Sequence, residues 1–170
     1  MQTTASAHIA SPARPSLLRA LLRTDSSWAP TIARVALGVV MLPHGLQKTL
    51  GWFGGNGFTN TLNWFTDAMH VPWIFGFAAI LAESLGALAL IAGFATRAAA
   101  AGVGVVFVTA VVMVHRSNGF FMNWSGTQKG EGLEYFILGL ALVAIVICQG
   151  AGAASIDGYL TRNPSDRNGR

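Results

Sequence analysis

Four apolar runs, at residues 30–50, 73–95, 98–114 and 133–150, restrict what this sequence can fold into more than any other feature. Crossing the hydrocarbon of a bilayer takes about 20 mostly apolar residues. A segment exposed to lipid must satisfy its backbone hydrogen bonds internally, which favours helices. The whole chain is 52% hydrophobic and only 11% charged, too apolar for an ordinary soluble domain. The runs therefore predict an all-α fold, a four-helix transmembrane bundle.

The positions of arginine and lysine predict how the bundle is oriented. With four spans, both tails and the loop between spans two and three share one side, which is the side richer in basic residues and hence cytoplasmic. A net charge of +4 could indicate nucleic-acid binding in a soluble protein, but most basic residues lie in the tails, so we expect no nucleic-acid partner. The cytoplasmic side collects Arg14, Arg19, Arg23, Arg97, Arg162, Arg167 and Arg170, whereas the other loops hold Lys48, Arg116 and Lys129.

These boundaries divide the chain into three parts. Residues 1–27 form a cytoplasmic tail, which we expect to be retained and partly disordered, with a short amphipathic segment. Residues 28–156 form the membrane domain, and residues 157–170 form a second cytoplasmic tail.

The two outer loops are aromatic. In the first, residues 51–72, four apolar residues at helical spacing predict a short helix lying on the membrane surface, with Trp64 and Trp73 as interfacial anchors. We expect no regular structure in the second, residues 116–132, which is rich in glycine. We also expect the two loops to face each other, as a lid would. The four apolar residues are Phe58, Leu62, Phe65 and Met69.

Glu83 is the most informative single residue, because it lies near the middle of span two. A carboxylate at that depth costs about 2.5–3.5 kcal/mol on insertion scales. The helical neighbours of Glu83 are small, which predicts that this face packs against other helices and avoids lipid. Two interpretations stay open: Glu83 binds a ligand or carries protons, or it is a structural carboxylate that is protonated or paired.

Four further ionisable residues gather in the outer half of the bundle. His44 follows Pro43, which cannot donate a backbone hydrogen bond and so favours a bend in span one. Lys48 ends span one, His115 ends span three, and Glu134 begins span four. Together with Glu83 they predict a polar ligand site between the helices. The alternative for Lys48, His115 and Glu134 is an ordinary interfacial position in contact with water.

Arg34 lies about one turn inside the cytoplasmic end of span one. From there we expect its long side chain to reach the lipid headgroups. The less favoured alternative is an inward-facing Arg34 that pairs with Glu83.

The sequence lacks the motifs typical of metal sites, of serine hydrolases, of nucleotide-binding proteins and of thiol redox enzymes. The histidines and glutamates are suitable metal donors, but no H-x-x-x-H or E-x-x-H spacing supports a metal site, and we predict none. There is no G-x-S-x-G or P-loop pattern. Cys148 is the only cysteine, so the chain holds no redox pair of thiols.

Several short motifs follow one another along the chain: Arg34, Leu37-Gly38, His44-Gly45-Leu46-Gln47-Lys48, Glu83-Ser84-Leu85-Gly86, Gly93-Phe94-Ala95-Thr96-Arg97, His115, Gly132-Leu133-Glu134 and Gly150 to Asp157. In this order and spacing they resemble those of the DoxX family of small bacterial membrane proteins. The resemblance implies a multi-pass protein of the bacterial cytoplasmic (inner) membrane, in some members part of an oxidoreductase complex that handles thiol or sulfur stress and passes electrons to quinone. Its architecture is similar to the small subunit of thiosulfate:quinone oxidoreductase and to vitamin K epoxide reductase, although this chain lacks the cysteine pair of the reductase.

Two hypotheses for function follow. In the first, the protein is a membrane component of an oxidoreductase system that binds a quinone-like or thiol-related ligand, which is not covalently attached. His44 and His115 would bind the polar head of the ligand, while Glu83 and Glu134 would exchange protons. A partner oxidoreductase or a second copy of the chain would complete the system. In the second, it is a non-enzymatic scaffold or a permeation protein for small molecules or protons. The pattern assigns no catalytic residue.

Overall fold

The computed structural model describes residues 21–24 and 26–161, and every regular element in those ranges is helical. The long helices are α2 (Trp28–Thr49), α4 (Trp73–Ala92), α5 (Thr96–Ala110) and α6 (Glu134–Gln149). A π-helical turn, η3 (Val111–His115), continues α5. The prediction of an all-helical fold is confirmed. Most of the predicted N-terminal tail 1–27, namely residues 1–20 and 25, lies outside the described residues, as do residues 162–170.

Three helical segments are long and apolar enough to cross a membrane: α2, α4, and α5 together with η3. Helix α6 is apolar but has only 16 residues. The chain is therefore an integral membrane protein, whereas a fourth crossing through α6 stays a prediction.

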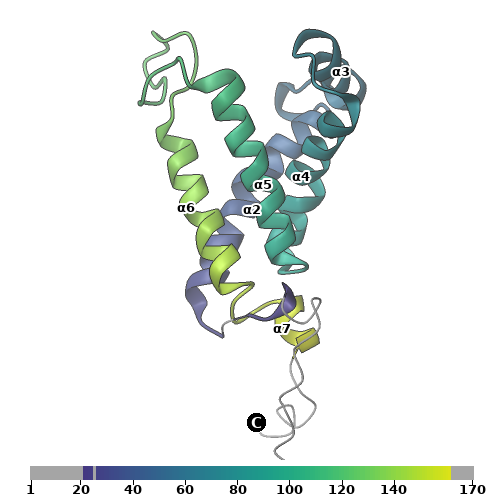
Figure 1. Cartoon of the computed structure of the whole chain (residues 1–170), viewed down its shortest axis with the longest axis vertical. Helices are drawn as coiled ribbons and strands as arrows, with labels where there is room; N and C mark the ends of the chain where they lie inside the picture. The colour runs from purple at the N-terminus through teal and green to yellow at the C-terminus, as the bar shows by residue number, and fades with distance from the viewer. Residues whose placement is uncertain (1–20, 25, 162–170) are drawn as a thin grey trace, which may run out of the picture.

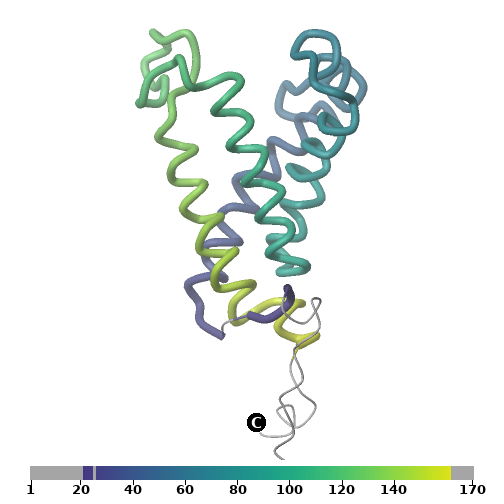
Figure 2. The backbone as a smooth tube through the Cα atoms, in the orientation of Figure 1, coloured from purple at the N-terminus to yellow at the C-terminus, as the bar shows by residue number. Residues whose placement is uncertain are grey.

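The long helices contact one another in a ring, in which α2 packs against α4 and α6, and α5 packs against the same two helices (Figure 1). Helices α5 and α6 diverge from α2 and α4 towards the end that carries α3 (Figure 2). The start of α2, the turn from α4 to α5, and α7 (Ile156–Thr161) all lie at the opposite end. Which of these ends faces the cytoplasm stays a prediction.

Glycines on α2 explain how closely it packs against α4. A Cβ atom on Gly45 would lie 2.3 Å from the carbonyl oxygen of Glu83, and one on Gly38 would lie 2.8 Å from that of Ala87. Such distances are too short for any side chain, so the two backbones touch along this line. The small-residue face around Glu83 therefore packs against a neighbouring helix, as predicted.

Arg34 does not reach the headgroups, and this expectation was wrong. Its side chain is 1% exposed and donates hydrogen bonds to the carbonyl oxygens of Leu90 and Ile91 at the end of α4, at 2.8 and 2.6 Å. It also donates to the carbonyls of Ala151 and Ala154, which follow α6. The last carbonyls of a helix have no partner within it, and a guanidinium with five donors satisfies several of them at once. Pairing of Arg34 with Glu83 is likewise not observed.

Asp157 connects α7 to the start of α5 at the same end of the molecule. Its carboxylate accepts hydrogen bonds from the backbone N–H groups of Ala95 and Thr96, at 2.8 and 2.9 Å, where α5 begins. A carboxylate there satisfies open N–H groups and interacts favourably with the helix dipole. Asp157 is 1% exposed, so the start of the predicted C-terminal tail packs into the helical domain.

The first outer loop contains the predicted short helix. Helix α3 (Gly57–Asn63) continues as a π-helical turn, η2 (Trp64–Ala68), and packs against α2 and α4. A short turn, η1 (Trp52–Gly54), precedes it. The second outer loop is irregular, as expected. The two loops lie at the same end of the molecule but stand apart at the tips of the diverging helices, so they form no closed lid in this structure (Figure 1). That they act as a lid stays a prediction.

Candidate functional site

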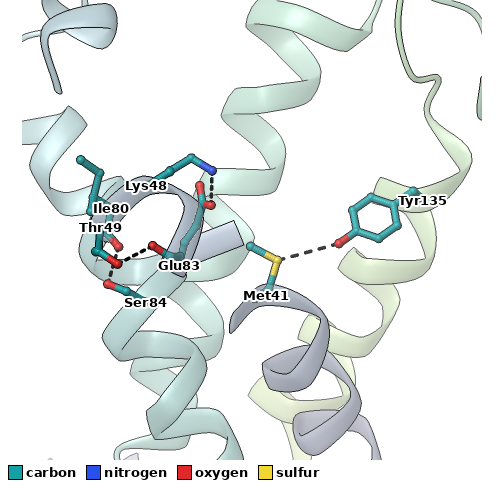
Figure 3. A network of polar contacts seen from close by, with 8 residues as sticks. Met41, Lys48, Thr49, Ile80, Glu83, Ser84 and Tyr135 are labelled. Carbon is teal, nitrogen blue, oxygen red and sulfur yellow. Dashed lines mark hydrogen bonds and ion pairs between the residues drawn. The ribbon is translucent and has the colours of Figure 1, made fainter. Parts of the chain in front are cut away.

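An ion pair joins α2 to α4 beside the close contact at Gly45. Lys48 lies three residues after Gly45, on the same face of α2, and its Nζ is 2.5 Å from Oε2 of Glu83 (Figure 3). The Glu83 side chain is only 6% exposed, whereas that of Lys48 is 24% exposed. The positive charge therefore offsets much of the cost of burying the carboxylate.

The ion pair lies in the wall of a pocket of about 290 Å³ between α2 and α4 on one side and α5 and α6 on the other. Its polar lining converges from several helices and from the second outer loop. Apolar and aromatic side chains form the rest. The full lining consists of Met41, His44, Lys48, Glu83, Val106, Phe107, Ala110, His115, Met122, Glu131, Tyr135 and Phe136.

The structure brings four of the six predicted site residues to this one pocket: His44, Lys48, Glu83 and His115. His44 is exposed and makes no hydrogen bond to the described part of the chain. Arg34 instead lies at the other end of the helices. Glu134, the sixth, is near the pocket in sequence but does not line it.

Glu134 accepts hydrogen bonds from the second outer loop instead of lining the pocket. Its Oε1 accepts hydrogen bonds from the backbone N–H of Met122, at 2.9 Å, and from the indole N–H of Trp124, at 3.3 Å. Neighbouring Glu131 acts in the same way through Oε2, which accepts the backbone N–H of Asn123 at 2.7 Å. These carboxylates fix the loop that supplies Met122 and Glu131 to the pocket.

His115 owes its place to the π-helical turn η3. The backbone N–H of Arg116 bonds to the carbonyl of Val111, five residues earlier, at 2.9 Å. A wider turn of this kind rotates the side chains that follow, and such turns are frequent at functional sites. The His115 ring packs on Phe136 with 4.6 Å between centroids, and its Nδ1 lies 2.8 Å from the Glu131 carbonyl oxygen.

Sequence reasoning missed Tyr135, the first aromatic residue inside α6. Its ring packs edge-on against Phe107 and Phe136, and its hydroxyl points across to the sulfur of Met41 on α2, at 3.9 Å (Figure 3). A tyrosine inside an apolar run is a signal in itself, because its hydroxyl needs a partner when it is buried. Its position directly after Glu134 was the clue available.

The pocket suits an organic ligand better than a metal ion. In the described ranges no three histidine, cysteine, aspartate or glutamate side chains come together as a metal site would require. Apolar walls with a few convergent polar groups are the usual composition of small-molecule sites.

The family model of DoxX matches residues 29–116, just over half of the chain. This protein belongs to the DoxX family. The matched part runs from the start of α2 to the end of η3, so it contains the ion pair and both pocket histidines. The α6 wall of the pocket, with Tyr135 and Phe136, lies outside the match. No curated protein and no solved structure matches this DoxX protein.

Proposed function

We propose that this DoxX protein is a membrane component of an oxidoreductase system, and that the pocket binds a small, largely apolar ligand with a polar head, of quinone-like or thiol-related chemistry. The observation that supports this most is the convergence of His44, Lys48, Glu83 and His115 on one pocket with aromatic walls. We further propose that the protein lies in the bacterial cytoplasmic membrane, with both termini inside.

The polar groups supply hydrogen bonds and protons but no electrons. His44 and His115 are suited to bind a carbonyl, hydroxyl or thiol head, and Glu83 with Lys48 to exchange protons as its charge changes. The single cysteine, Cys148, lies on α6 and cannot cycle with a second thiol of the same chain. Electrons must therefore come from the ligand itself or from a partner protein. Either a separate oxidoreductase or a second copy of the chain would serve as that partner.

The direct test is to purify the protein in lipid nanodiscs, extract it with organic solvent, and identify quinones and thiol compounds by mass spectrometry. We expect one such compound to co-purify and His44→Asn to lower its amount about tenfold, the effect of losing one good hydrogen bond. His70→Asn is the matched control, because His70 is exposed on the first outer loop and asparagine tolerates its positive φ of 54°.

Two results would lead us to abandon the proposal: no quinone or thiol compound in the extract, together with unchanged redox behaviour of membranes carrying Glu83→Gln. Ion flux into proteoliposomes would then favour permeation. Crosslinking that retrieves a stable partner without any ligand would favour a scaffold.

A further inference from the structure

The hydrogen bond of His115 to the second outer loop fixes which of its ring nitrogens carries the proton. A backbone carbonyl oxygen can only accept, so the contact of 2.8 Å between Nδ1 and the Glu131 carbonyl requires a proton on Nδ1. In a neutral imidazole the other nitrogen, Nε2, is then a hydrogen-bond acceptor. The carbonyl also accepts from Asn118 Nδ2 at 3.2 Å, which holds it in place.

Nε2 is therefore the ring nitrogen of His115 that is available to accept a hydrogen bond from a ligand. It makes no hydrogen bond within the described ranges, and His115 is one of the pocket-lining residues. Beside it stand the aromatic faces of Phe136 and Phe107, with Tyr135 between α6 and α2. The pocket therefore combines a strong acceptor with aromatic surface, which matches a ring that carries a donor.

The charges around the pocket favour a neutral ligand. Lys48 and Glu83 neutralise each other, whereas Glu131 lines the pocket with no basic partner in the described structure. The pocket therefore carries no net positive charge that would favour an anionic ligand. A neutral hydroxyl group would meet the acceptor on His115.

We propose that the pocket selects neutral aromatic hydroxyl compounds, with the ligand O–H donated to His115 Nε2. This inference rests on the proposed ligand-binding function and narrows it to one class, the phenols, which includes the reduced ring of a quinone. A pocket of about 290 Å³ is at the small end of ligand sites and holds a single ring better than a fused system.

The test compares para-ethylphenol with its methyl ether, which has the same ring but no donor. Binding is measured by equilibrium dialysis in mildly alkaline buffer, as the difference between protein-loaded and empty nanodiscs. We expect the phenol to bind about tenfold more tightly than the ether, the usual effect of one good hydrogen bond. The comparison is repeated with the phenol and its methyl ether carrying a dodecyl chain in place of the ethyl group, to distinguish a ligand that enters from the lipid from one that enters from water. We expect the phenol to bind more tightly than the ether in whichever of the two pairs binds.

Three variants separate the acceptor role from a structural one. His115→Phe keeps a ring against Phe136 but removes Nε2, so the preference should disappear. His115→Gln offers an amide oxygen and should retain part of it. Asn118→Ala removes the other donor to the same loop carbonyl and leaves the imidazole, so the preference should stay intact.

Equal binding of phenol and ether, or a preference that survives His115→Phe, would overturn the hydroxyl assignment and leave ligand binding itself standing. No binding of either probe would overturn this inference as well. The identity of the co-purified compound would then decide the proposed function separately.

Discussion

The unequal exposure of the two partners makes the ion pair between α2 and α4 a sharp test of the structure. In Lys48→Met the Glu83 carboxylate, 6% exposed, would remain buried with no cation beside it. Breaking a buried pair in this way costs about 3–5 kcal/mol. In Glu83→Gln the lysine that remains is 24% exposed and can turn towards the pocket mouth, so we expect a cost of about 1 kcal/mol.

Unfolding of the purified variants in mixed micelles, by increasing the fraction of denaturing detergent, gives the free energies of unfolding to be compared. The double variant Lys48→Met/Glu83→Gln should cost less than Lys48→Met alone, because it no longer buries an unpaired charge. The reasoning is refuted if Glu83→Gln proves as costly as Lys48→Met, or if the two single effects add in the double variant.

Three further predictions follow from the packing. Gly45→Ala should cost about 2 kcal/mol in the same unfolding assay, because its Cβ would lie 2.3 Å from the Glu83 carbonyl oxygen. The control Gly86→Ala, whose Cβ would have its nearest neighbour at 3.8 Å, should be close to neutral. Equal costs would contradict the close contact of α2 with α4. Asp157→Ala should cost about 2–3 kcal/mol through loss of two hydrogen bonds, one buried and one partly buried, and Asp157→Asn should cost less. A neutral Asp157→Ala would show that α5 needs no cap. Glu134→Ala should speed amide hydrogen exchange at residues 116–133 and leave α3 unchanged; exchange that stays slow in this loop would show that other contacts hold it.

The sequence alone predicted where the helices lie and which residues gather at one end. Each of the four apolar runs contains a long helix, and the boundaries differ by a few residues at most, because the length and composition of a run follow from the chain itself. The rise of about 1.5 Å per residue also placed His44, Lys48, Glu83 and His115 in the same half of the molecule.

Contacts between helices were harder to predict. For Lys48 the sequence left open whether it belongs to the polar site or to the interface, and it placed Arg34 at the headgroups. In the structure Lys48 pairs with Glu83, and Arg34 binds carbonyls at two helix ends. Depth along a helix is a property of one segment. Hydrogen-bond partners depend on how far each helix is rotated and where it crosses its neighbour.

What the sequence determined by itself is thus a set of apolar helices with ionisable groups at known depths, because hydrophobic length and helical rise are local. What only the tertiary structure decided is which of those groups share a pocket. Gly45 lets α2 approach α4 closely enough for Lys48 to reach Glu83, while Glu134 turns to the outer loop and leaves Tyr135 at the site. Those choices follow from close packing between segments far apart in the chain, where a shift of a few ångströms changes every partner.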